Sequence, residues 1–93
     1  MRVGWTRRAL ARVNAIAAYG AADDPKAALS LLDRLEAAVA RLAESPGIGR
    51  PGRVPGTREL VVRGTPYLVP YRVRDDVVEI LTVFHTSRRP PPG

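Results

Sequence analysis

A chain of 93 residues, 45% of them apolar and 26% charged, has room for one small domain built around a single hydrophobic core. Fifteen Lys and Arg residues against nine Asp and Glu residues give a formal net charge of +6, and the chain has no cysteine and one histidine. This composition excludes a disulfide framework and a thiolate metal site, and a single histidine argues against a zinc site. We therefore expect neither a metal nor a cofactor.

The charged residues indicate what kind of partner the chain has. Lys26 is the only lysine, so nearly all of the cations are arginines, whose planar fork pairs well with phosphate and carboxylate groups. The net charge suits an acidic protein or a nucleic acid; the codon preference of a GC-rich genome is an alternative cause of the choice of Arg over Lys. The N-terminus lacks the apolar run of a signal peptide, and no stretch approaches the roughly 20 apolar residues of a membrane span. We expect a cytoplasmic protein that has no membrane partner.

The first half of the chain predicts a short strand followed by two helices. Residues 2–5 are partly β-prone, and Thr6 can cap a helix over Arg7 to Tyr19, in which apolar residues recur at helical spacing until Gly20. Asp24-Pro25 is a stronger start signal, because Asp can cap and Pro fits the first helical position. This second helix keeps one apolar face until Ser45-Pro46-Gly47 ends it. The short connection predicts an antiparallel helical hairpin.

The second half predicts a loop over residues 47–56, rich in glycine and proline, and then consecutive antiparallel strands. The three β-like runs are Thr57 to Arg63, Tyr67 to Arg74 and Val77 to His85. Residues 88–93 are expected to form a frayed, flexible tail, because successive prolines remove the donors of a strand.

Alternation assigns faces and positions to these strands. It places Tyr67, Val69, Tyr71 and Val73 on one side of their strand, which we expect to face the helices. The last strand is apolar on both of its faces from Val77 to Val83, which favours a central position in the sheet. Pro70 suggests that its own strand lies at an edge or contains a bulge.

The predicted fold is α+β, with the order β-α-α-β-β-β in a single domain over residues 1–93. The helical hairpin packs on one face of a small antiparallel sheet, because that sheet must bury one side. The other face, or an edge, remains open to a partner.

Six residues on or after the predicted strands are candidates for chemistry or binding. His85 could act as a general acid or base, although a lone histidine more often packs or forms hydrogen bonds. The arginines could bind the phosphate of RNA or an acidic protein surface, or they could form a solvated rim. The arginines in question are Arg58, Arg63, Arg72, Arg88 and Arg89.

Three motifs in the second half, residues 56–62, 66–73 and 78–88, follow one another in an order that resembles the ParE/RelE toxins of bacterial type II toxin-antitoxin modules. The resemblance covers nearly the whole chain and implies the RelE/ParE-like fold. It also implies a partner, a partly disordered and acidic antitoxin whose C-terminal segment wraps around the toxin.

The family has two activities, which this chain could share. RelE-like members cleave mRNA on the ribosome with basic residues on the open sheet face and a late Tyr, whereas ParE-like members poison DNA gyrase. Here Leu68 stands where RelE-like enzymes carry an Arg, and Pro90-Pro91-Pro92 replaces the late Tyr. The ending from Val83 to Arg88 resembles ParE-like chains more closely.

The leading hypothesis is therefore a ParE-like toxin that inhibits gyrase and is neutralised by a cognate antitoxin. For this activity Arg58, Arg72 and Arg89 are the expected macromolecule-binding residues. The alternative is a RelE-like, ribosome-dependent mRNA endoribonuclease, in which His85 assists proton transfer while Arg63 and Arg88 act with Arg72 on the phosphate. A third possibility is an antitoxin-binding remnant that has no toxicity.

Overall fold

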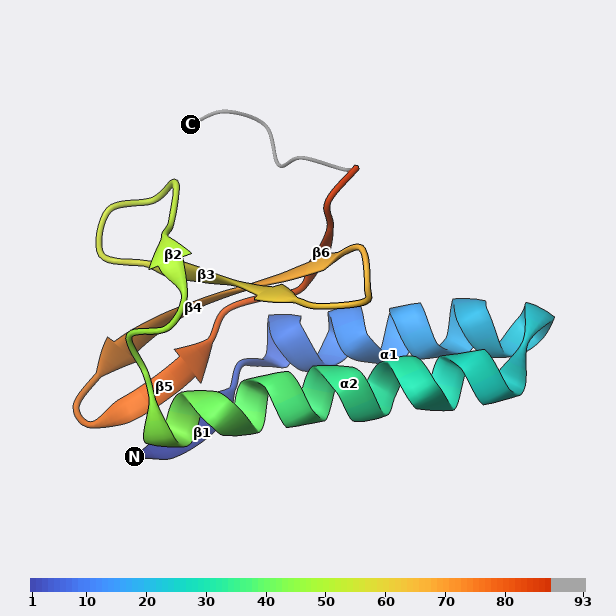
Figure 1. The fold of residues 1–93 in the computed structure, drawn as a ribbon, viewed down its shortest axis with the longest axis horizontal. Helices are drawn as coiled ribbons and strands as arrows, with labels where there is room; N and C mark the ends of the chain where they lie inside the picture. The colour runs from blue at the N-terminus through green and yellow to red at the C-terminus, as the bar shows by residue number, and fades with distance from the viewer. Residues whose placement is uncertain (88–93) are drawn as a thin grey trace.

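The computed structural model describes residues 1–87 and confirms an α+β fold. Two helices lie side by side beneath one face of a single sheet, and their far ends extend beyond it (Figure 1). The elements in chain order are β1 (Arg2–Trp5), α1 (Arg7–Asp23), α2 (Pro25–Glu44), β2 (Arg50–Pro51), β3 (Arg58–Val62), β4 (Tyr67–Arg74), β5 (Val77–Ile80) and β6 (Phe84–His85). The predicted order is correct, except that the short strand β2 lies within the predicted loop over residues 47–56 and the predicted last strand, Val77 to His85, is divided into β5 and β6. The tail expected over residues 88–93 lies outside the described residues.

Helix α1 begins where expected but ends later. The Thr6 hydroxyl accepts a hydrogen bond from the Ala9 amide at 3.1 Å, and it also lies 2.9 Å from the Ile80 carbonyl oxygen, which ties the start of α1 to the end of β5. The predicted end at Tyr19 is wrong by four residues. A glycine inside a helix lowers helix stability by only about 1 kcal/mol relative to alanine, and the alanines that follow Gly20 favour helix. The helix therefore continues through Gly20.

One residue connects the two helices. The backbone amide of Asp24 donates to the Gly20 carbonyl at 2.9 Å and so ends α1, while its carboxylate accepts from the Ala27 amide at 3.1 Å and so begins α2. Pro25 occupies the first turn of α2, as expected, because its missing N–H has no partner there in any helix. The predicted antiparallel hairpin is confirmed.

The sheet has the strand order β1-β5-β4-β3-β2, and β6 pairs with the start of β4. All neighbouring strands are antiparallel except β1 and β5, which are parallel, so the sheet is mixed rather than purely antiparallel. The central position expected for the last strand is confirmed, because β5 lies between β1 and β4.

Pro70 lies in a central strand, so the edge position that its presence suggested is wrong. The Pro70 carbonyl accepts from the Leu81 amide at 2.9 Å, which shows that the main chain of Pro70 is directed toward the last strand of the sheet. That strand is interrupted between Ile80 and Phe84, opposite the position where proline lacks a donor. The interruption accommodates proline within a central strand, as a bulge would.

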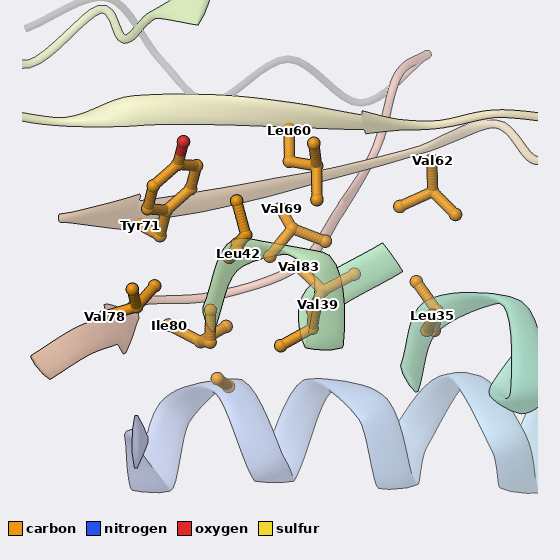
Figure 2. Close-up of a cluster of buried hydrophobic side chains, with 11 residues drawn as sticks. Leu35, Val39, Leu42, Leu60, Val62, Val69, Tyr71, Val78, Ile80 and Val83 are labelled. Carbon is orange, nitrogen blue, oxygen red and sulfur yellow. The ribbon is translucent and has the colours of Figure 1, made fainter. Parts of the chain in front are cut away.

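The core fills the space between the sheet and the helices (Figure 2). Leu35, Val39 and Leu42 of α2 meet residues of β3, β4 and β5, and Ala9 of α1 completes the cluster. Tyr67, Val69 and Tyr71 contribute to this core as predicted, whereas Val73 on the same side of β4 is exposed. Leu68 and Pro70, whose side chains lie on the opposite side of β4, are also buried.

Tyr71 also fixes the loop that follows α2. Its side chain is fully buried, and its hydroxyl donates to the Pro46 carbonyl at 2.6 Å and accepts from the Gly49 amide at 2.9 Å. The ring lies so close to Gly49 that a Cβ atom there would come within 2.7 Å of it. Position 49 therefore requires glycine.

We predict that Tyr71→Phe lowers the free energy of unfolding by about 1–3 kcal/mol, because it leaves two backbone groups of the loop without their partner. Chemical denaturation monitored by circular dichroism would measure the change. Tyr19→Phe is the matched control, since Tyr19 is 82% exposed, and it should change stability by less than about 0.5 kcal/mol. Equal effects of the two substitutions would contradict the role assigned to Tyr71.

Candidate functional site

On the sheet face that points away from the helices, two arginines each face a glutamate on the neighbouring strand. Arg72 of β4 lies opposite Glu79 of β5, and its Nε and Nη2 atoms are 2.8 and 2.7 Å from the same carboxylate oxygen. Arg50 of β2 lies opposite Glu59 of β3 at 3.4 Å, and Glu59 also accepts from the Arg53 amide. Each pair cancels one positive charge of this face.

Next to the Arg50–Glu59 pair, on the side away from Arg72, the open face is apolar. The strand register places Pro70 beside Glu59, then Leu68 beside Val61, and Phe84 of β6 on the other side of Leu68. Val61 is half-exposed, at 49%, while Leu68 is buried. This part of the face offers apolar contact rather than charge.

His85 lies on β6 at one end of the sheet. Its ring packs edge-on against Tyr67, with ring centroids 5.3 Å apart and an interplanar angle of 83°. The Ser87 amide donates to His85 Nδ1 at 3.2 Å, and the Ser87 hydroxyl lies 2.6 Å from the same atom. Because Nδ1 accepts a hydrogen bond, this geometry fits the neutral tautomer that carries its proton on Nε2.

The arginines predicted as site residues are dispersed. Arg63 is exposed at the end of β3, and its carbonyl accepts from Nη1 of Arg34 at 3.4 Å. Arg58 lies on the helix side of β3, where its Nη1 donates to the carbonyls of Gly47 at 3.4 Å and Gly49 at 2.8 Å. Arg72 is held by Glu79, and Arg88 and Arg89 lie outside the described residues.

We predict that Arg58→Gln lowers the free energy of unfolding by about 1 kcal/mol, because the guanidinium group holds the same loop that Tyr71 holds. Arg74→Gln, which removes the same charge from an exposed position at the end of β4, should change it by less than about 0.5 kcal/mol. Thermal and chemical unfolding would measure both variants. An unchanged stability of Arg58→Gln would leave partner binding as the remaining role of this residue.

One basic groove was missed by the sequence analysis. It lies between α2 and the outer edge of β3 and has a volume of about 530 Å³. Arg34 and Arg41 of α2 lie on its helix side, and Arg50 and Arg63 lie on its sheet side. The sequence carried a signal for it: Arg34 and Arg41 are two helical turns apart and so share a face. A second groove of about 460 Å³ lies between β1 and the two helices and is lined mostly by apolar side chains.

Within residues 1–87 no three His, Asp or Glu side chains are grouped so that they could hold a metal ion. In the same part of the chain, neither helix combines the length and the apolar character that crossing a membrane requires.

Comparison with known proteins gives concordant results. Residues 3–90 match the sequence model of the ParE toxin of the type II toxin-antitoxin system parDE. The protein Y4kP of Sinorhizobium fredii, which carries a provisional toxin name, is 51% identical over 90 residues, covering 97% of this chain and 93% of the relative. Toxin RelE2 of Caulobacter vibrioides is 41% identical over 87 residues, covering 94% of this chain and 97% of that protein.

Among solved structures, a chain of the chromosomal ParDE toxin-antitoxin system of P. aeruginosa superposes with a TM-score of 0.83 at 32% sequence identity. The match covers 91% of this chain and 95% of that one.

Proposed function

Because this chain belongs to the family of ParE toxins of type II toxin-antitoxin systems, we propose that it acts in the cytoplasm by binding and inhibiting DNA gyrase, and that a cognate antitoxin neutralises it. The relatives are named after both branches of the ParE/RelE superfamily, so the target is inferred from the site rather than from the names.

The observation that carries this proposal is the charge balance of the open sheet face. An RNA-cleaving site needs cations that are free to stabilise the phosphate in the transition state. Arg72 and Arg50 are instead each paired with a glutamate, and the part of the face next to the Arg50–Glu59 pair is apolar. A surface of this kind favours binding to a protein over cleavage of a nucleic acid.

Two observations support an antitoxin partner. A solved structure that resembles this chain at a TM-score of 0.83 is the chromosomal ParDE toxin-antitoxin system of P. aeruginosa. The chain also carries a net charge of +6, which attracts an acidic protein segment. The antitoxin that we propose is therefore acidic in the part that contacts this chain.

We expect the purified protein to abolish gyrase supercoiling of a relaxed plasmid at stoichiometric excess and to trap a cleaved gyrase–DNA complex. Agarose gels with and without protease treatment would show both effects. A preparation of Val39→Asp, which buries an unpaired carboxylate in the core and should not fold, controls for contaminating activity. Unaltered supercoiling together with no trapped complex would contradict the proposal.

A second candidate function is ribosome-dependent mRNA cleavage, favoured by the partly buried His85, whose Nδ1 accepts from the Ser87 amide, and by the exposed Arg63. If this activity exists, primer extension on translated messages should show discrete cuts. His85→Ala should reduce them about 10²–10⁴-fold, the usual contribution of a general acid or base, whereas Arg74→Ala should leave them unchanged. Cuts that persist in His85→Ala would show that His85 is not the catalytic group.

Growth after induction separates both activities from a non-toxic, antitoxin-binding protein. Early loss of translation would indicate mRNA cleavage, and filamentation with DNA-damage signalling would indicate gyrase inhibition. Unimpaired growth would indicate a chain that only binds the antitoxin.

A further inference from the structure

The far end of the helical hairpin, residues 17–30, extends beyond the sheet (Figure 1). It carries the two most exposed of the large apolar side chains within residues 1–87, Tyr19 at 82% and Leu29 at 63%. We propose that this segment, the ledge, is the surface through which the chain contacts gyrase, and that Tyr19 is its anchor. The inference rests on the proposed function, because it concerns the same target.

The ledge contributes little to the hydrophobic core. Ala28 is its only buried residue, and Gly20 packs on it so closely that a Cβ atom at position 20 would lie 3.5 Å from the Ala28 Cβ atom. Most of the other side chains of the ledge are alanines or short polar groups. Because such side chains bury little apolar area, the ledge adds little to stability. Its exposed tyrosine is free to contact another protein.

Tyr19 lies on the side of α1 that faces the sheet. Arg12 is two helical turns before it and therefore shares its face, and the Arg12 Nε atom donates to the Val83 carbonyl at 3.3 Å. The sheet does not extend over the ledge (Figure 1), and the Tyr19 side chain is accordingly uncovered. Asp23 is one turn after Tyr19 and lies on the same face. A partner that contacts this face meets an aromatic ring and a carboxylate together.

The charge of the ledge is opposite in sign to that of the whole chain. It contains Asp23, Asp24 and Lys26 and no arginine, whereas the chain has a net charge of +6. Within residues 1–87 Asp23 forms no ion pair. Acidic protein segments and DNA phosphates are therefore attracted to the rest of the surface and not to the ledge. An enzyme that holds DNA presents Lys and Arg side chains to it, and such a surface complements Asp23. The occupant is thus a basic protein surface of gyrase rather than its DNA.

A tyrosine among small side chains has the properties of an interface anchor. Tyrosine is enriched among the residues that dominate binding energy, and its ring offers a large contact area while only two torsion angles are fixed on binding. Ala15 and Ala22 lie one turn before and after Tyr19 and are small enough to let a partner reach the ring. The ring, rather than the hydroxyl group, is expected to supply most of the contact.

The test measures binding of the full chain to immobilised, DNA-free gyrase by biolayer interferometry. Tyr19→Ala should weaken binding about tenfold or more, as loss of a central aromatic anchor does. Tyr19→Phe keeps the ring and should change binding by less than about threefold. Leu10→Ala, which removes another exposed apolar side chain of α1 outside the ledge, should change it by less than about twofold.

Folding and activity are followed on the same variants. Circular dichroism should show that Tyr19→Ala is folded, because the substituted side chain is exposed and alanine favours helix. Tyr19→Gln, a second helix-compatible replacement without a ring, should weaken binding equally. Inhibition of supercoiling should fall in parallel with binding.

A pair of aspartate variants tests the charge of the occupant. Asp23→Asn should weaken binding several-fold at low ionic strength and less at high ionic strength, because it removes a charge that attracts a basic surface. Asp33→Asn removes the same charge from an exposed position of α2 outside the ledge and should have the smaller effect.

The outcomes separate this inference from gyrase inhibition itself. A folded Tyr19→Ala variant that binds and inhibits gyrase as well as the unsubstituted chain overturns the ledge and leaves gyrase inhibition intact. Absence of binding and inhibition by the unsubstituted chain overturns both. Equal losses in Asp23→Asn and Asp33→Asn overturn the basic surface as the occupant. Loss of affinity of Tyr19→Ala for linear DNA without gyrase would assign Tyr19 to nucleic acid and so also overturns the inference.

Discussion

The structure depends on burial of one face of the sheet against a helical hairpin. Strands this short are not stable by themselves, and the apolar stripe of α2 supplies the surface that β3, β4 and β5 need. The buried side chain of Tyr71 extends this core to the loop after α2, because its hydroxyl bonds Pro46 and Gly49. That loop leads into β2, which contributes Arg50 to the basic groove. The core thus determines both where the open face lies and where the edge of β3 is exposed.

Charge is distributed unevenly between these two surfaces. On the open face, Glu59 and Glu79 each hold an arginine, so the face is closer to neutral than the arginine count suggests. In the groove, Arg34, Arg41 and Arg63 have no carboxylate partner within residues 1–87. A toxin that must be recognised by both an antitoxin and a cellular target benefits from such a division. Two surfaces of different chemistry can bind partners that do not resemble each other.

Local signals in the sequence predicted most of the fold. Thr6, Asp24 and Pro25 marked the helix starts, and the strand Tyr67–Arg74 was predicted with its observed bounds, because caps and alternation act over a few residues. The parallel pairing of β1 with β5 and the central position of Pro70 involve contacts distant in the chain, which local patterns do not report. The site was harder to predict for the same reason. Arg72 and Glu79 are seven residues apart and become partners only through the register of β4 and β5.

Asp24 restricts how the connection between the helices of this chain can change in length. Since one residue both closes α1 and opens α2, the two helices share a joint with no spare length. An insertion of even one amino acid there would separate the two capping roles and turn one helix relative to the other. Loop-length variation, a common route by which small domains acquire new contacts, is therefore disfavoured at this end of the molecule. Diversification is left to substitutions on the helix surfaces and to the segments that flank β2.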